Sequence, residues 1–132
     1  SQGPTLAPDS ASPSVRSALL WLGKQSLEEY KLTYPAKDNA YYYFSKLLDI
    51  EPENQEAKNG IMMIAERYAI LAEKAMADND YQKSEAYINI GLQIDPNNAS
   101  LHSIRSFLSD LDDPSFLETI FSMFSRNKAA TD

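Results

Sequence analysis

Apolar residues recur every three to four positions along most of the chain, which is the spacing of an amphipathic α-helix. No segment requires the strict alternation of apolar and polar residues that marks a half-buried strand. The spacing predicts six helices, at residues 13–34, 40–51, 54–78, 81–94, 99–111 and 114–125. The third is long because no proline interrupts it. We therefore predict an all-α fold of about six antiparallel helices with an elongated central helix.

Residues typical of helix ends mark the boundaries of these segments. Ser12 followed by Pro13 is a favoured pair for an N-cap and a first helical position. Pro35 is expected to end the first helix, because proline disfavours helical backbone before it. Asp38 or Asn39 is expected to cap the second helix.

The two ends of the chain differ from its middle. Residues 1–12 are rich in proline and serine, which is typical of a flexible linker or an artificial end of a fragment. Residues 126–132 are expected to fray. Residues 13–125 are therefore predicted to form a single helical domain.

A block of residues occurs twice in the chain. Tyr, Leu, Ile, an acidic residue, Pro and Asn recur with the same spacing in residues 43–54 and 87–98, so that Pro52 is matched by Pro96. Internal repetition at such a period marks a protein built by stacking similar helical units. Stacked units expose extended faces rather than closed pockets. The repetition therefore favours binding over catalysis.

Residues 65–98 resemble a tetratricopeptide repeat (TPR), a helix-turn-helix unit of about 34 residues. The matching residues are a large-small pair in the first helix, two small residues in the second and a closing proline, namely Leu71, Ala72, Ser84, Gly91 and Pro96. Ala75 and Asn79 depart from the usual aromatic residue and glycine. A weaker likeness extends over residues 14–125, with an earlier second helix at residues 39–54. The family implies a right-handed stack of hairpins in which helices A and B alternate.

In the TPR family, the A helices of successive units line a groove that binds partner segments. The resemblance places the groove at Glu66, Ala69, Glu73 and Met76, and in the neighbouring units at Gln25, Glu29, Ser103 and Phe107. TPR domains that grip a C-terminal carboxylate carry Lys, Arg or Asn at such positions, whereas Ala69 and Glu73 occupy two of them here. The resemblance therefore implies a basic or mixed apolar protein segment as the partner. An ordinary solvated face is the alternative interpretation of Glu66 and Glu73.

Helical geometry divides the aromatic run at residues 41–44. Tyr43 and Phe44 align with interior positions in the second copy of the block and are predicted to be interior themselves. Tyr41 is expected to touch a neighbouring unit. Tyr42 is the residue of the run expected to be exposed.

The last predicted helix has a strongly apolar side. The residues on it include Phe116, Ile120, Phe121 and Phe124. Such a side covers the preceding helix as a cap, or else it stays partly open and joins two copies of the chain as a homodimer.

Composition narrows the class of partner. The chain has 132 residues, of which 12 are basic and 19 acidic, and its net charge is −7. No basic stripe is present, which argues against binding to nucleic acid or anionic lipid. No apolar stretch reaches the roughly 18 residues of a membrane-spanning helix, so we expect no membrane insertion. The absence of cysteine excludes disulfides but fits the cytoplasm and the periplasm equally, and we interpret the chain as part of a larger bacterial protein.

Residues suited to catalysis are sparse. The chain has one histidine, His102, and its four glycines form no phosphate-binding loop. Adjacent carboxylates such as Glu28 and Glu29 do not share a helix face. We expect no enzymatic activity, no cofactor and no metal. The leading hypothesis is a non-catalytic scaffold or adaptor module that docks a partner on its helix A face. The alternative is a spacer or self-association domain that dimerises through its C-terminal helix.

Overall fold

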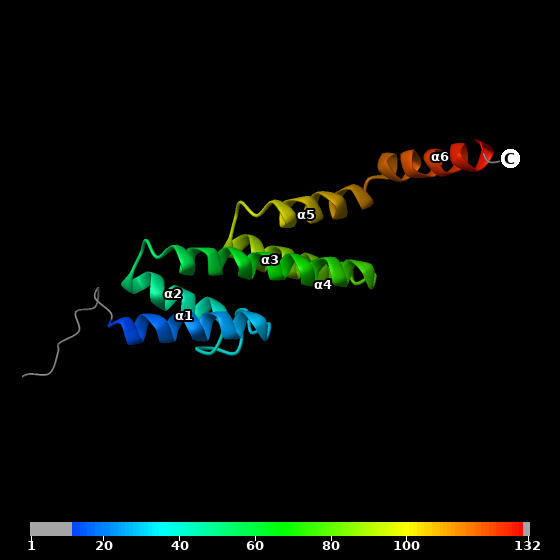
Figure 1. Ribbon diagram of the computed structural model, residues 1–132. Helices are drawn as coiled ribbons and strands as arrows, with labels where there is room; N and C mark the ends of the chain where they lie inside the picture. Colours follow the sequence, from blue (N-terminus) through cyan, green and yellow to red (C-terminus); the bar gives the residue numbers. More distant parts are fainter. Residues whose placement is uncertain (1–11, 131–132) are drawn as a thin grey trace, which may run out of the picture.

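The computed structural model describes residues 12–130 and is all-helical in that range, as the sequence predicts. Figure 1 shows the helices in chain order. They are α1 (Pro13–Glu28), α2 (Ala40–Ile50), α3 (Gln55–Ala77), α4 (Tyr81–Ile94), α5 (Ala99–Leu111) and α6 (Pro114–Ala130). With 23 residues, α3 is the elongated central helix that the sequence indicates.

Side-chain caps explain where the first five helices begin. In each case the cap accepts a hydrogen bond from the backbone N–H three residues further on; the caps are Ser12, Asn39, Asn54, Asp80 and Asn98. The second helix is thus capped by Asn39 rather than by Asp38. The asparagine that closes each copy of the repeated block has the same role, because Asn54 starts α3 and Asn98 starts α5.

The end of α1 differs from the prediction. This helix ends at Glu28, well before Pro35, so the predicted continuation through residue 34 is wrong. Tyr30 has a φ of 57°, a left-handed conformation that cannot continue the helix. The chain then turns back and buries Leu32 in the core. Periodicity missed this turn because Tyr30 and Tyr34 keep helical spacing although both are exposed.

The C-terminal boundary also differs, because α6 continues to Ala130 and not only to residue 125. Of the linker expected at residues 1–12, only Ser12 belongs to the described residues, and there it caps α1. Residues 131–132 of the tail lie outside them.

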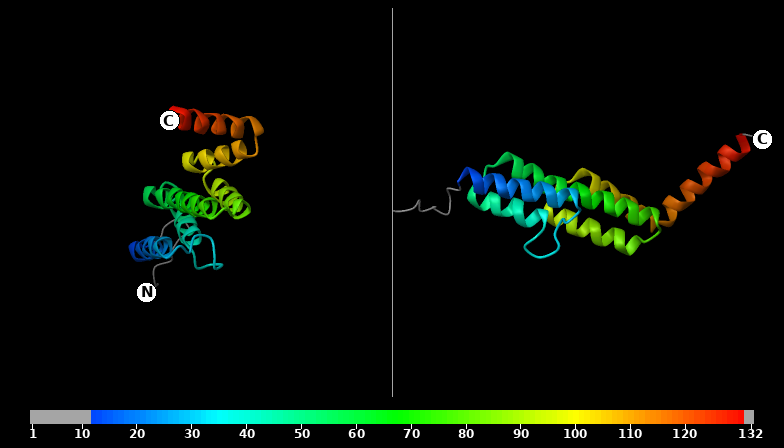
Figure 2. Two further views of the ribbon diagram at one scale, coloured as in Figure 1. Left: turned by 90° about the vertical axis from the view of Figure 1, so that its right-hand side faces the viewer. Right: turned by 60° about the horizontal axis from the view of Figure 1, so that its bottom comes forward.

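The helices stack in the order in which they occur along the chain (Figures 1 and 2). The helices α1 and α2 form one hairpin, and α3 and α4 form the next. The first helix of the second hairpin contacts both α1 and α2, and α5 in turn packs against both α3 and α4. Among the described residues, α6 is in contact with α5 alone. Each unit therefore covers the apolar side of the unit before it.

Two apolar clusters lie on either side of α3, which contributes to both. The first gathers around Phe44, and its other large members are Leu27, Leu32, Leu47, Ile64 and Tyr68. The second contains Ile88, with Leu101 and Ile104 from α5 and small residues from α3. Phe44 and Ile88 occupy the same position in the repeated block, and each is 1% exposed. The prediction that this position is interior is confirmed.

Two glycines make room for the ring of Phe44. A Cβ atom at Gly23 of α1, or at Gly60 of α3, would lie only 2.6 Å from ring carbons of Phe44. Side chains do not pack at that distance, so both helices approach the ring with their backbones. The ring of Phe44 therefore fills a slot between α1 and α3 that only glycine leaves open.

The aromatic run before this slot is arranged differently from the prediction. Tyr41 is exposed, whereas Tyr42, which was expected to be the exposed residue, is half-buried. The ring of Tyr42 packs edge-on against Tyr43, with 5.4 Å between centroids, and the ammonium of Lys46 lies 5.5 Å from its centre. These neighbours cover Tyr42, so the prediction for it is wrong.

Candidate protein-interaction surfaces

Two of the four groove residues expected on α3 are covered by the fold. Ala69 is only 2% exposed and belongs to the second apolar cluster, so its assignment to a binding surface is wrong. Met76 is half-buried against the same cluster. The reason is that α5 lies directly on this side of α3, where the small side chain of Ala69 permits close helix packing.

The two acidic groove residues are exposed, but they differ in their surroundings. The carboxylate of Glu66 accepts hydrogen bonds from Asn98 Nδ2 at 2.9 Å and from Ser100 Oγ at 3.4 Å. Since Asn98 caps α5, Glu66 helps to hold α5 against α3 and is not simply a solvated residue. Glu73, two turns further along α3, is exposed to solvent. In the neighbouring unit Ser103 and Phe107 are exposed as well.

Three exposed apolar residues on α3 were missed in the sequence. They are Met62, Met63 and Ile70. Met63 and Ile70 are two helical turns apart and therefore lie on one stripe, with Glu66 between them. The sequence contains the information needed to find them, because they are large apolar residues of α3 that do not fit the spacing of its buried stripe. Apolar side chains interrupted by carboxylates suit a partner that is itself part apolar and part basic.

A cleft of about 320 Å³ lies between α1 and α3. It is lined by Lys24, Leu27, Glu28, Phe44, Glu56, Asn59, Gly60 and Met63. Leu27 and Phe44 belong to the core and give the cleft an apolar floor. Lys24 Nζ lies 3.0 Å from Glu56 Oε2, so an exposed ion pair bridges the two helices at the rim. A second pair joins Glu28 to an arginine of α3 at 3.6 Å. Such exposed pairs add little stability, but they give the rim its charge pattern.

The residues expected on α1 do not line this cleft. Gln25 and Glu29 are exposed, and Gln25 Nε2 donates a hydrogen bond to Glu29 Oε1 at 3.2 Å. Besides Leu27 of the floor, the α1 side chains in the cleft are Lys24 and Glu28, which come one position before Gln25 and Glu29. The repeated pattern is irregular in this part of the chain. A fixed spacing therefore predicts binding residues on α1 that lie one position after the residues found in the cleft.

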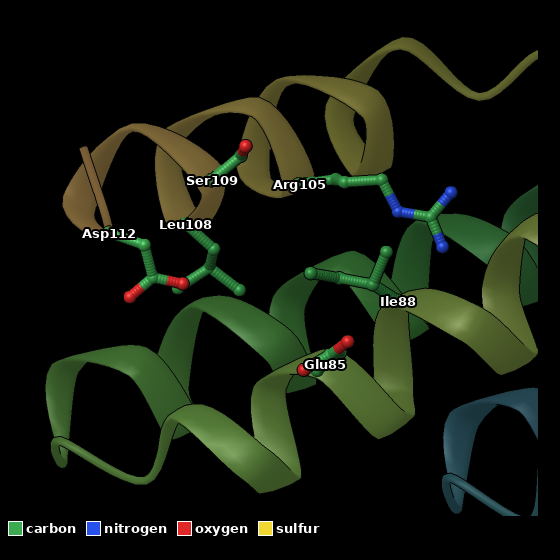
Figure 3. A pocket seen from close by; sticks show the side chains of 6 residues that line it. All are labelled: Glu85, Ile88, Arg105, Leu108, Ser109 and Asp112. Atoms are coloured by element: carbon green, nitrogen blue, oxygen red, sulfur yellow. The ribbon is translucent and has the colours of Figure 1, made fainter.

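A second cleft, of about 400 Å³, opens where α5 diverges from α4 (Figure 3). Side chains from both helices point into it, among them Glu85 and Ile88 of α4 and Leu108 of α5, together with Asp112 just after the end of α5. Arg105, also in the lining, donates a hydrogen bond to an asparagine side chain of α4. No sequence pattern predicts this cleft. It depends on how α4 and α5 lie relative to each other, and apolar spacing within each helix does not determine that.

A charged cluster fixes the connection between α1 and α2. Asp38 accepts hydrogen bonds from Lys31 Nζ at 3.0 Å and from the Tyr43 hydroxyl at 2.8 Å. Both hydrogen bonds lower the pKa of Asp38, and the one from Lys31 has the larger effect. In turn, the hydrogen bond that each donor makes to Asp38 raises the pKa of Lys31 and of Tyr43. The cluster lies on an exposed connection, which indicates a structural role.

At the other end of the molecule, α6 projects from the stack (Figures 1 and 2). Its N-terminal Phe116 meets Phe107 of α5 edge-on, with 6.3 Å between ring centroids. Phe116 and Ile120 are half-buried, whereas Phe121 and Phe124 are each 70% exposed. The helix therefore does not cover α5 as a cap would, and its apolar side is partly open.

Within residues 12–130, no group of three or more His, Cys, Asp or Glu side chains is placed to hold a metal ion. The ring nitrogen Nε2 of His102 lies 2.6 Å from the carbonyl oxygen of Pro96, so this residue is engaged at the turn into α5. In the same range, no helix has the length and apolar character needed to cross a membrane.

In comparisons with known proteins, no family model matches the chain, and no curated protein and no solved structure is significantly similar to it.

Proposed function

We propose that this chain is a non-catalytic protein-interaction module with a TPR-like stack, and that it docks a partner segment on the face formed by α1, α3 and α5. The order of helix contacts supports the stack. The first, third and fifth helices contact one another in succession, and α3 and α5 also contact the helices that precede them in the chain. These three helices have the places of the A helices in the resemblance drawn above, so they offer one continuous face.

The observation that carries the proposal is the cleft between α1 and α3. Its apolar floor, formed in part by Leu27 and Phe44, can accept a bulky apolar side chain of a partner. Met63 stands at its edge and is exposed, and Ile70 continues the apolar stripe along α3. Methionine is flexible and polarizable, which allows such an edge to adapt to the segment that it receives.

Charges around the cleft define the chemistry of the partner. The rim carries two carboxylates, Glu28 and Glu56, and each is paired with a cation, Arg67 or Lys24. The acidic character lies further along α3, at Glu66 and Glu73. A partner with an apolar anchor flanked by Lys or Arg complements this pattern, whereas a free carboxylate would meet like charge. The proposed ligand is therefore a short basic-apolar segment, extended or helical.

A selection from a displayed peptide library tests the proposal. We expect the wild-type chain to select peptides with an aromatic or aliphatic residue flanked by Lys or Arg, and their affinities can be measured by fluorescence anisotropy. Met63→Glu is expected to weaken the selected peptides at least about tenfold, since it charges the edge of the apolar cleft. Glu73→Lys should weaken the more basic peptides and spare neutral ones.

Ile90→Glu is the matched control, because Ile90 is an exposed apolar residue of α4, outside the proposed face. It introduces the same charge and should leave peptide affinity unchanged. Equal loss of affinity in Met63→Glu and Ile90→Glu, or selection of acidic peptides, would contradict the proposed surface.

A further inference from the structure

The apolar side of α6 is a surface that the proposed function does not use. Phe121 and Phe124 are 70% exposed, and Leu117 and Met123 beside them are also exposed. Among the described residues the helix is held only through its start, where Phe116 meets α5. Two large aromatic side chains on an otherwise unsupported helix mark a surface that another element covers.

The preceding helix cannot cover this surface. The apolar residues of α5, namely Leu101, Ile104 and Leu108, pack back against the second cluster. Its other side is exposed and mostly polar, with Ser103, Ser106, Ser109 and Asp110; its large apolar residue, Phe107, is the one that Phe116 already meets. A helix folded back onto that side would find little further apolar area to bury. The partner of α6 must therefore come from outside this part of the chain.

We infer that α6 pairs with α6 of a second copy of this chain, in antiparallel orientation. Charge favours this partner. Residues 114–126 carry one acidic residue, Glu118, and one basic residue, Arg126, although the whole chain has a net charge of −7. Two copies can therefore approach through α6 without the repulsion that their acidic surfaces otherwise impose. In an antiparallel pair, the Glu118 end of each helix lies beside the Arg126 end of the other. The two helix dipoles then point in opposite directions, which is favourable.

The area available sets the strength of the pair. An aromatic side chain buries about 150–250 Å², so the exposed parts of the four apolar residues offer on the order of 400–500 Å² per copy. The total, roughly 800–1,000 Å², lies at the lower limit of specific protein interfaces. We therefore expect the dimer to be weak and its formation to depend on concentration.

The position of α6 places this pairing away from the proposed peptide site. Figures 1 and 2 show the helix extending beyond the stack, away from α1. The cleft between α1 and α3 stays open when two copies join through α6. Loss of the dimer and loss of peptide binding are thus separate results.

Sedimentation equilibrium of the 132-residue chain, from about 5 to 500 µM, tests the pairing. We expect a reversible monomer–dimer equilibrium for the wild type and a monomer for Phe121→Asp at every concentration. Ser122→Asp is the matched control, because it adds the same charge on the polar side of α6 and should leave the dimer intact. Both variants should melt like the wild type by circular dichroism, since neither position belongs to the core.

Two results overturn the inference. One is a wild type that stays monomeric throughout, including the case in which it binds phosphatidylcholine vesicles instead. The other is a Phe121→Asp variant that dimerises as well as Ser122→Asp does.

Orientation can be read from label distances, because the chain has no cysteine of its own. Spin labels are placed on Ser122→Cys, at the level of Phe121 but on the polar side of α6, and on Ser115→Cys, two turns earlier on the same polar side. In an antiparallel pair centred near Phe121, the two labels at position 115 are offset by about 18 Å along the axis. They should be clearly farther apart than the labels at position 122. Equal separations would indicate a parallel pair and overturn the antiparallel arrangement.

Discussion

Replacing Gly60 by alanine is the most direct test of how the first hairpin packs. The substitution adds a single methyl group, which would lie 2.6 Å from two ring carbons of Phe44. The ring cannot move toward α1, because on that side a Cβ at Gly23 would also lie 2.6 Å from it and the backbone of α1 is already in contact. Phe44 is 1% exposed, so its neighbours enclose nearly all of the ring even where it borders the cleft.

Two opposing effects set the size of the change. Alanine stabilises a helix interior by about 0.8–1.0 kcal/mol relative to glycine. Overpacking of a well-filled core costs about 1–3 kcal/mol. Both neighbours of the ring are backbone, so the upper part of that range applies, and Gly60→Ala should reduce the free energy of unfolding by roughly 1–2 kcal/mol. That loss corresponds to a fall in melting temperature of about 4–10 °C.

A double-mutant cycle separates the clash from other effects. In a Phe44→Leu background, the ring atoms that meet the new methyl group are absent. Gly60→Ala should then show only its helix propensity and stabilise the variant by up to about 1 kcal/mol. Gly60→Ala thus destabilises the chain that has Phe44 and stabilises the chain that has leucine at position 44. The coupling free energy between the two positions is about 2 kcal/mol or more. Urea unfolding followed by circular dichroism measures all four chains.

The matched control is Asn59→Ala, the exposed residue next to Gly60, which should change the free energy of unfolding by less than about 0.5 kcal/mol. The reasoning fails if Gly60→Ala stabilises the wild-type chain, or if its effect is the same with Phe44 and with Leu at position 44. Either result would mean that the ring does not occupy the slot between α1 and α3.

Two further predictions concern the second hairpin and the first connection. Gly91→Leu should destabilise the chain by about 1–3 kcal/mol, since even its Cβ would lie 2.5 Å from Leu101 Cδ1, and an unchanged melting temperature would refute this. Asp38→Asn should lower the melting temperature at pH 6, and the difference from wild type should shrink as the pH falls through the lowered folded-state pKa of Asp38, because its contribution is lost as protons bind. A difference between the two chains that grows on acidification would contradict the role given to this carboxylate.

Features that depend on neighbours in the sequence were predictable. Helix positions follow from apolar spacing and from capping residues, and these act within one or two turns. The repeated block identified Phe44 as an interior residue before its surroundings were known, because its match in the second copy stands at the corresponding place in the helix. The length of α3 followed from the absence of proline.

Features that depend on distant segments were not predictable in the same way. The burial of Ala69 follows from the position of α5, which begins some thirty residues later in the chain. The early end of α1 depends on the space that Leu32 fills beneath α2 and α3. The cleft between α1 and α3 is formed by residues such as Lys24 and Glu56, which only the stacking of two hairpins brings together. A fixed repeat spacing could not locate it, because the repeat is irregular there.

The position of α3 between two apolar clusters has a consequence for communication within the molecule. One side of its N-terminal half, at Gly60, borders the cleft, and further along the same helix Ala65, Ala69 and Ala72 seat α5. A side chain that enters the cleft and shifts α3 must therefore also change the contact with α5, because one rigid helix serves both. Binding at the cleft and the placement of α5 with its attached α6 are then linked equilibria, and the influence runs equally in both directions.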